Sequence, residues 1–149
     1  MAALGDIHGA IAGRLSTIDG LRAFPNPPQG ATAPVAYVRL TEWAIDTFSR
    51  TPPVQLGLEV VVLTAQTVRP EDGYAPLMEF ADPTGSRSIR LAVWDGNEAG
   101  TFSGTWNGTA FACLRTQAVV TGFRVLGVAE MDEFQMYGGA FAVTVTTSS

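Results

Sequence analysis

The segment Leu56-Gly57-Leu58-Glu59-Val60-Val61-Val62-Leu63-Thr64 decides the fold class of this chain. Successive side chains of a β-strand point to opposite faces, so the alternate positions from Leu56 to Val62 share one face. That face consists of Leu56, Leu58, Val60 and Val62. A strand with one wholly apolar face needs a covering layer, and we therefore expect a sheet with helices packed on it.

The residues before this segment predict its neighbour in the sheet. Val35–Leu40 is typical of a strand and leads toward Trp43 and Ile45. Thr47–Pro53 contains two prolines and separates the two strands, so we expect it to form a hairpin loop that projects from the sheet.

The last third of the chain predicts two more strands. Thr116–Ala129 is rich in valine, and Ala140–Thr147 alternates Phe and Val with Thr. This alternation is typical of a half-buried strand whose Thr face meets water or a partner. Between the two strands we expect an acidic loop over Glu130–Gly139.

The N-terminal residues predict a helix. Apolar residues recur at three- and four-residue spacing from Leu4 to Ile18, namely Leu4, Ile7, Ile11, Leu15 and Ile18. Gly20 follows, where a helix C-terminus favours glycine. The proline-rich linker Phe24–Gly30 cannot be helical and predicts an extended crossing.

Two central segments predict further helices. Thr67–Ala81 begins with a capping Thr, an early proline and acidic residues, and it should end at Asp82-Pro83. Ser86–Trp94 predicts a second short helix with Ser86 as its N-cap.

A hairpin signal follows the central helices. Asn107-Gly108 suits a two-residue type I′ turn, in which both central residues have positive φ. The turn would place four apolar side chains on one face, namely Phe102, Trp106, Phe111 and Cys113. The domain's own core or a neighbouring subunit must cover that face.

These segments together predict one α+β domain over residues 1–149. We expect an antiparallel or mixed sheet of about four main strands. An N-terminal helix and one or two central helices pack on it, and a β-hairpin is inserted.

The composition favours burial against partners. Charged residues make up 15 % of the chain, against roughly 25 % in ordinary soluble domains. The net charge is −5, and every basic residue is Arg, which argues against wrapping nucleic acid. An acidic face is compatible with a channel through which DNA slides. The absence of a signal-peptide pattern or a membrane-length apolar run predicts a soluble protein made in the cytosol.

The sequence offers little for catalysis, and we expect no enzyme, cofactor or metal site. The single His8 and the single Cys113 are interpreted as structural residues. The adjacent acids in Glu71-Asp72 and in Asp132-Glu133 diverge, whether on a helix or on a strand. No phosphate-binding glycine loop is present.

The order of the segments resembles the tail terminator family of long-tailed phages, most of all its actinobacteriophage versions. The resemblance spans nearly the whole chain. The segments that carry it are Ala12–Arg22, the proline-rich crossing, Val60–Leu63, Tyr74–Phe80, Gly85–Ile89 and Tyr137–Val143. The Phe102–Phe111 hairpin is longer than we expect for this family.

The resemblance implies a structural virion protein in the tail or neck, assembled in the host cytoplasm. Such a protein forms a homohexameric ring on the last ring of tail tube protein and stops tube polymerisation. Its other face meets a head-completion or stopper protein. DNA passes through the lumen without specific binding, and no membrane is involved.

Two alternatives remain open at this point. The chain could be another neck component, such as a head–tail connector or a stopper. It could also be a bacterial small-ligand-binding domain that uses Phe102, Trp106 and Phe111 as an aromatic platform, although core packing is the preferred interpretation of these three residues.

Apolar residues among charged or proline-rich neighbours are the candidates for subunit or partner contacts. Trp43 and Phe48 flank the first hairpin loop. Phe134, Met136 and Tyr137 lie in the predicted acidic loop. Phe102 and Trp106 from the inserted hairpin complete this set.

Overall fold

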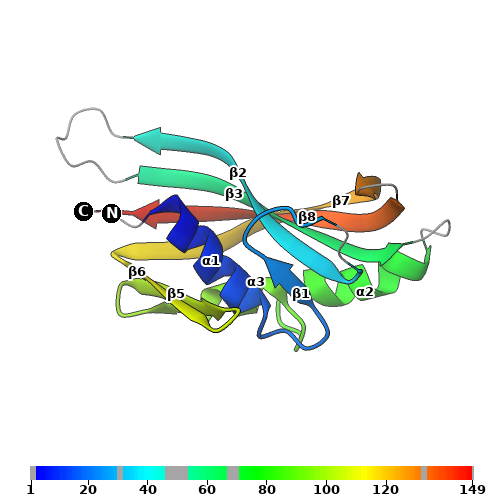
Figure 1. The fold of residues 1–149 in the computed structure, drawn as a ribbon, viewed down its shortest axis with the longest axis horizontal. Helices are drawn as coiled ribbons and strands as arrows, with labels where there is room; N and C mark the ends of the chain where they lie inside the picture. The colour runs from blue at the N-terminus through cyan, green and yellow to red at the C-terminus, as the bar shows by residue number, and fades with distance from the viewer. Residues whose placement is uncertain (1–2, 30–31, 46–53, 67–70, 132–133, 149) are drawn as a thin grey trace.

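A computed structural model describes residues 3–29, 32–45, 54–66, 71–131 and 134–148. Within these ranges, three helices lie on one side of a large curved sheet, and a small sheet packs against the first helix (Figure 1). The helices are α1 (Leu4–Leu15), α2 (Glu71–Ala81) and α3 (Ile89–Trp94). The predicted α+β class is confirmed.

The large sheet has the strand order β1-β2-β3-β8-β7. Its strands are β1 (Arg22–Phe24), β2 (Val35–Ile45), β3 (Val54–Gln66), β8 (Phe134–Thr147) and β7 (Thr116–Met131). The short β1 pairs parallel to β2, and the other neighbours pair antiparallel. The sheet is therefore mixed, with four long strands, as the sequence predicts.

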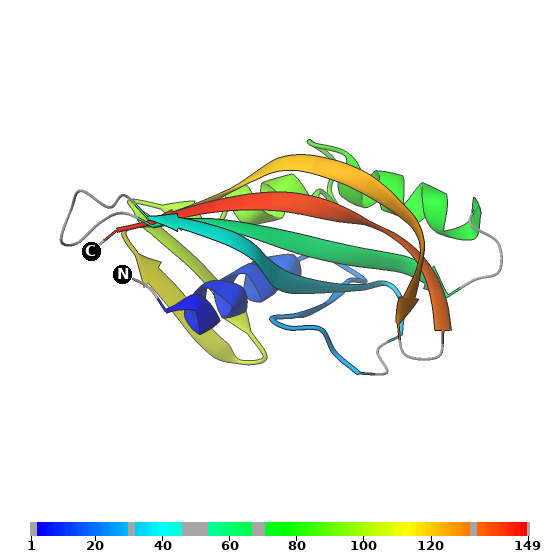
Figure 2. The ribbon, with the colours of Figure 1, turned by 90° about the horizontal axis from the view of Figure 1, so that it is seen from above.

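The main core lies between this sheet and the helices. The predicted apolar face of β3, from Leu56 to Val62, is buried there together with Ile7, Ile11 and Leu15 of α1. Each such side chain contributes about 1.5–3 kcal/mol to the free energy of unfolding when it is fully buried. Figure 2 shows α1 on the side of β2, and α3 on the side of β7.

A second, smaller core lies on the opposite face of the sheet. Val35, Val61, Leu63 and Met136 are almost fully buried, and Tyr37 is among the residues that pack against them. This cluster forms where β7 and β8 curve strongly (Figure 2). Phe24, Ala33 and Leu126 also pack against this cluster, so strand and loop residues cover it on a face without helices.

The inserted hairpin is confirmed and belongs to a small sheet. Its strands are β4 (Asn97–Glu98), β5 (Thr101–Trp106) and β6 (Thr109–Leu114), in that order. Asn107 and Gly108 have φ of 50° and 80°, as a type I′ turn requires. α1 lies between the two sheets and approaches β5 closely. A Cβ at Gly104 would collide with the carbonyl oxygen of Ala10.

The helix ends differ from the prediction in two places. α1 ends at Leu15, and Ile18 lies in the following turn, although its side chain is still buried. Ser88, not Ser86, is the N-cap of α3, because its extended backbone allows its Oγ to accept a hydrogen bond from the Leu91 N–H at 3.2 Å. α2 begins at Glu71, so the predicted capping Thr67 lies outside the described residues.

The predicted acidic loop over Glu130–Gly139 is wrong. β7 continues to Met131 and β8 starts at Phe134, with Glu130 opposite Gln135 in the ladder. β8 also pairs with β3, where Gln66 lies opposite Met136. Two ladders thus hold this segment in the sheet, which its acidic composition does not indicate. The sequence also misses β1, while the predicted loop Thr47–Pro53 lies outside the described residues.

Candidate interaction surfaces

The aromatic face of the hairpin is covered by the chain itself. The side chains of Phe102 and Cys113 are 0 % exposed and belong to the main core beneath α1. Trp106 is half-buried, and its Nε1 donates a hydrogen bond to the carbonyl oxygen of Ala23 at 2.7 Å. The ring of Phe24 meets the Trp106 indole edge-on, with 6.5 Å between the ring centroids. Core packing is therefore the correct interpretation of this face, and the aromatic platform has no support.

The other predicted contact residues lie either buried in the sheet or outside the part of the chain whose side chains are described. Met136 and Tyr137 are buried within the sheet, so they are not the exposed loop residues that the sequence predicts. Trp43 and Phe134 lie in β2 and β8, and their side chains are outside the description. Phe48 lies wholly outside the described residues.

The structure exposes apolar side chains that the sequence analysis missed. Trp94, Phe123 and Val125 are 47 %, 37 % and 47 % exposed and lie on α3 and β7. We call this side the β7 flank. Phe123 and Val125 follow the alternating pattern of a buried strand, but β7 is an edge strand with a neighbour on one side only. Their exposure depends on the strand order, which a single sequence does not give.

Two further leucines are exposed on the opposite side of the molecule. Leu4 in the first turn of α1 and Leu40 in β2 are 44 % and 38 % exposed. α1 and β2 contact each other, and we call this side the β2 flank. β1 pairs only with Val35–Tyr37, so the edge of β2 from Val38 to Ile45 has no strand partner among the described residues.

A groove of about 330 Å³ runs along the β7 flank between β7 and the central helices. Its lining is mainly apolar and includes Ala81, Pro83, Val120, Phe123 and Phe141, with Arg90 as its charged member. The rings of Phe123 and Phe141 lie 4.7 Å apart and form its floor. Such a groove suits an apolar side chain of a partner.

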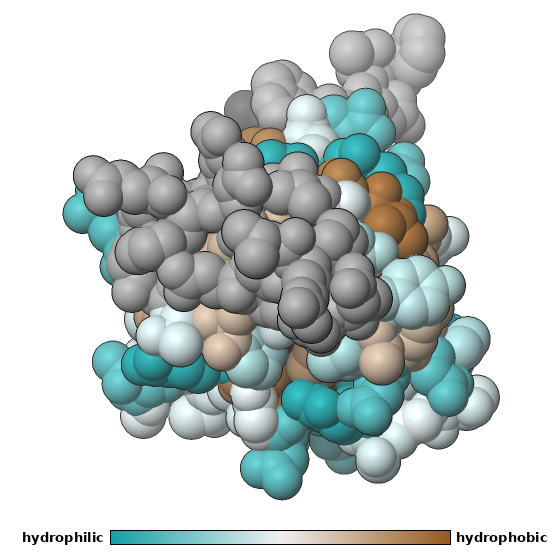
Figure 3. All heavy atoms as spheres, turned by 90° about the vertical axis from the view of Figure 1, so that its right-hand side faces the viewer, coloured by the Kyte–Doolittle hydropathy of each residue, from teal (hydrophilic) through white to brown (hydrophobic). Residues whose placement is uncertain are grey.

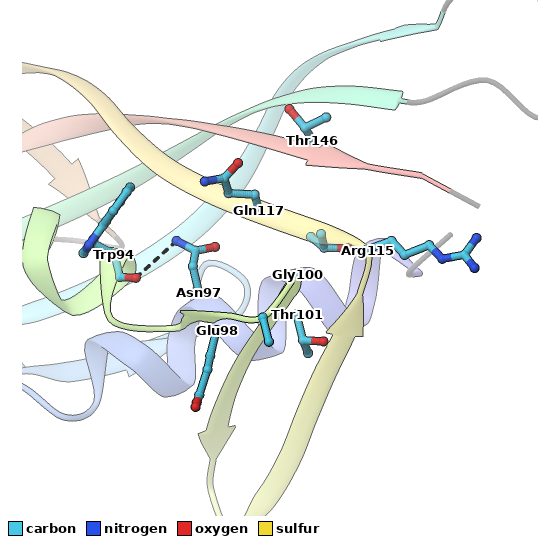
Figure 4. A pocket seen from close by; sticks show the side chains of 10 residues that line it. Trp94, Asn97, Glu98, Gly100, Thr101, Arg115, Gln117 and Thr146 are labelled. Carbon is cyan, nitrogen blue, oxygen red and sulfur yellow. Dashed lines mark hydrogen bonds between the residues drawn. The ribbon is translucent and has the colours of Figure 1, made fainter.

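A second, open hollow of about 510 Å³ lies beside β4 (Figure 4). Glu98 and Arg115 line it but point in different directions, so its charged groups do not converge on one point (Figure 4). Asn97 in its wall holds the edge of β7. Its Nδ2 donates to the Ala118 carbonyl oxygen at 2.7 Å, and its Oδ1 accepts from the Ala118 N–H at 2.9 Å.

A charge cluster lies on the face of the sheet that carries no helix. Glu59 of β3 accepts hydrogen bonds from Arg39 of β2 and from Arg124 of β7, the latter at 3.2 Å. Burial acts to raise the pKa of Glu59, but its hydrogen bonds to the two arginines outweigh burial and lower it. The carboxylate is therefore a structural link across three strands.

His8 and Cys113, which the sequence analysis interprets as structural residues, both contact other parts of the fold. His8 Nδ1 bonds the carbonyl oxygen of Pro25 at 3.0 Å. Cys113 is fully buried, and burial raises the pKa of its thiol to about 11. In the part of the chain that the structure describes, no three His, Cys, Asp or Glu residues gather as metal ligands. The side chains of Glu71-Asp72 and Asp132-Glu133 fall outside that part.

Hydrophobic residues also reach the surface at the end formed by α2 and the curved β7–β8 hairpin, beside hydrophilic ones (Figure 3).

None of the described helices has the length and apolar character needed to cross a membrane. No known family model and no curated protein sequence matches the chain.

Proposed function

We propose that this chain is a structural virion protein of a long-tailed phage. It acts as one subunit of a hexameric ring that caps the tail tube, stops tube polymerisation and joins the tail to the head-completion proteins. The proposal rests on the resemblance to tail terminators and on one observation. Apolar side chains are exposed on both lateral flanks of an open sheet, at Phe123 and Val125 on one flank and at Leu40 on the other.

Ring closure needs this arrangement. A head-to-tail ring joins two different surfaces of each subunit, so both surfaces must tolerate burial. The two flanks meet this requirement because they lie toward opposite edges of the sheet.

The surface area supports the same proposal. The chain exposes 7,994 Å², whereas a folded monomer of this mass exposes about 7,300 Å². One side of a standard protein–protein interface buries roughly 800 Å². Two lateral neighbours and one axial partner would cover about a third of the surface.

The charge suits a passage for DNA better than a binding site. The net charge of −5 repels a polyanion at long range. On the open face, the two arginines beside Glu59 are held by its carboxylate, which reduces their attraction for phosphate. We therefore expect the ring to let DNA pass through without specific binding.

Disruption of the gene in the phage that carries it tests the function directly. Loss of a tail terminator should give overlong, headless tails in negative-stain electron microscopy. Tails of normal length together with heads that leak DNA would instead identify a stopper or a connector. Particles of normal appearance from the disrupted phage would contradict any essential role in the neck.

Mass photometry tests the assembly. The purified chain, alone or with tail tube subunits, should give particles of six copies. Monomers in both settings would contradict the ring.

A further inference from the structure

The edge strand β7 is open over a short stretch of its length. It ends the large sheet (Figure 2), and every residue from Thr121 to Val125 is exposed. Apart from the ladder with β8, no backbone hydrogen bond within the described ranges occupies this stretch. An unpaired edge presents N–H and C=O groups outward, so an extended chain can add to it as one more strand.

The protein itself completes the earlier part of the same edge. Asn97 donates to the carbonyl oxygen of Ala118 and accepts from its N–H, as a neighbouring strand would. Register shifts in the ladder with β8 then lie at both ends of the run Gly122–Val125. This run is therefore a regular piece of free edge, and one short extended segment fits it.

The helix side of this edge favours apolar side chains. Phe123 and Val125 are alternate residues of the strand, so they lie on the same face, and both are exposed. Beside them lies the groove of about 330 Å³ that the rings of Phe123 and Phe141 floor. Alternate side chains of an added strand would point to this face and bury these apolar groups.

The charges at this edge favour an acidic segment. Arg124 on the open side is 60 % exposed and uses only its Nη2 to bind Glu59, so donors of its guanidinium remain for another carboxylate. Arg90 lines the groove, is exposed and forms no ion pair within the described ranges. Asp82, next in the chain to a groove residue, lines a different hollow and accepts a hydrogen bond from the Thr84 N–H. A cation thus lies on each side of the free edge.

A second copy of this chain matches the edge poorly. If a copy repeats the sheet, its β2 runs antiparallel to β7, and Leu40 beside Phe123 then brings Arg39 beside Arg124. The acid of the same strand, Glu42, already lies over its own β3. Among the other described edge strands, β1 and β6 carry no acid, and β4 has no apolar residue. A different protein is therefore the better source of the segment.

We propose that the edge of β7 from Gly122 to Val125 binds an extended segment of a different protein by strand addition. Apolar side chains of the segment lie on the helix side, against Phe123 and in the groove, and acids lie on the open side at Arg124. Arg90 selects a further acid at the end of the apolar run. The site is complete within one subunit, so this inference goes beyond the proposed ring and does not depend on it.

A synthetic peptide of this pattern tests the site. The probe is Ser-Val-Glu-Val-Glu-Glu-Ser, with fluorescein at its N-terminus and an amide at its C-terminus. Its even positions carry two valines and one acid for the helix side, and its odd positions carry the acids for the open side. It should bind the purified chain in fluorescence anisotropy titrations. The same peptide with Gln in place of every Glu should bind about tenfold more weakly, because it loses the attraction of both arginines. Equal binding of the two peptides would overturn the acidic occupant.

N-methylation of the probe tests strand addition. In an added antiparallel strand, the N–H groups of alternate residues point toward β7 and the others point away. Methylation of the even or of the odd backbone nitrogens should therefore have unequal effects, with binding abolished in one peptide and retained in the other. Equal effects would show that no strand forms and would overturn the inference.

A pair of variants tests the position of the peptide. Arg124→Gln should weaken binding of the probe by about threefold, as the loss of one exposed ion pair predicts. Arg22→Gln is the matched control, because it removes the same charge from β1 at the far edge of the sheet. Circular dichroism melts show whether both variants fold. Equal affinity of two folded variants would place the peptide elsewhere and overturn the site.

A competitor tests the source of the segment. An unlabelled peptide with the sequence of residues 38–45, from β2, should displace the probe at least tenfold less effectively than the unlabelled probe does. Equal displacement would make a second copy the occupant and overturn the inference.

The outcomes also separate this inference from the proposed function. A chain that binds the probe but stays monomeric, alone and with tail tube subunits, would overturn the ring alone. Hexamers that do not bind the probe would overturn the inference alone.

Discussion

The side-chain amide of Asn97 hydrogen-bonds both the N–H and the carbonyl oxygen of Ala118, as a neighbouring strand would. Asn97→Ala should therefore lower the free energy of unfolding by about 1–3 kcal/mol, because it leaves two partly buried backbone groups unpaired. Chemical denaturation measures the change. Gln117→Ala, on an exposed residue of the same hollow, should change it by less than about 0.5 kcal/mol. Equal effects would show that Asn97 does not act through Ala118.

The N-cap of α3 predicts that substitutions at Ser88 and Ser86 change stability to different extents. Ser88→Ala should destabilise the protein by about 1 kcal/mol, because the Leu91 N–H loses its acceptor. Ser86→Ala should be nearly neutral, since this serine is exposed and does not cap the helix. Thermal melts of the two variants test the assignment, and the reverse order would contradict it.

Because α1 and β5 approach closely at Gly104, we expect a larger residue there to lower the stability strongly. Gly104→Ala should cost about 3 kcal/mol, because the added Cβ collides with the backbone of Ala10 and cannot be relieved by a side-chain rotation. Gly122→Ala is the matched strand control, because nothing lies within 4 Å of its Cβ position. If Gly104→Ala proved as mild as the control, the close approach of the helix would be refuted.

Glu59 predicts a dependence of stability on pH. Its pKa is lowered in the folded chain, so its ionised form stabilises the fold above the unfolded-state pKa. This stabilisation is lost as the pH falls through the lower, folded-state value. The stability difference between wild type and Glu59→Gln should therefore be largest near neutral pH and vanish in acid. A difference that stays constant between neutral and acidic pH would contradict the link to both arginines.

Cys113 should be inert in the folded chain. Its thiol is buried, and burial raises its pKa to about 11, so little thiolate forms at pH 8. A thiol-reactive dye should label the native protein slowly and the urea-unfolded protein fast. Rapid labelling of the native protein would contradict the burial of this part of β6.

The sequence predicts those parts of the fold for which a local pattern allows only one structure. The alternation in β3 and β8 fixes which face is buried, and Asn107-Gly108 permits few turns. The segment around Met136 differs from the prediction because its acidic neighbours suggest exposure to solvent, whereas pairing with two strands decides its structure. Non-local pairing cannot be read from composition.

The candidate contact surfaces were harder to predict for the same reason. Phe102 and Phe123 are both aromatic residues on strands, yet one is fully buried and the other is exposed. The difference arises because α1 covers the hairpin, while β7 ends the sheet. Local polarity, which favours residues such as Met136 and Tyr137 as contacts, does not reveal this distinction.

The position of α1 between two sheets makes the inserted hairpin an integral part of the domain. One side of the helix packs on the large sheet through Ile7 and Ile11, and its glycines Gly9 and Gly13 abut the hairpin. Removal of residues 97–114 would take away β5 and β6, which make most of the contacts of the helix. The two sheets should consequently melt together in a single transition, with amide protons of β5 and β3 exchanging through the same global opening.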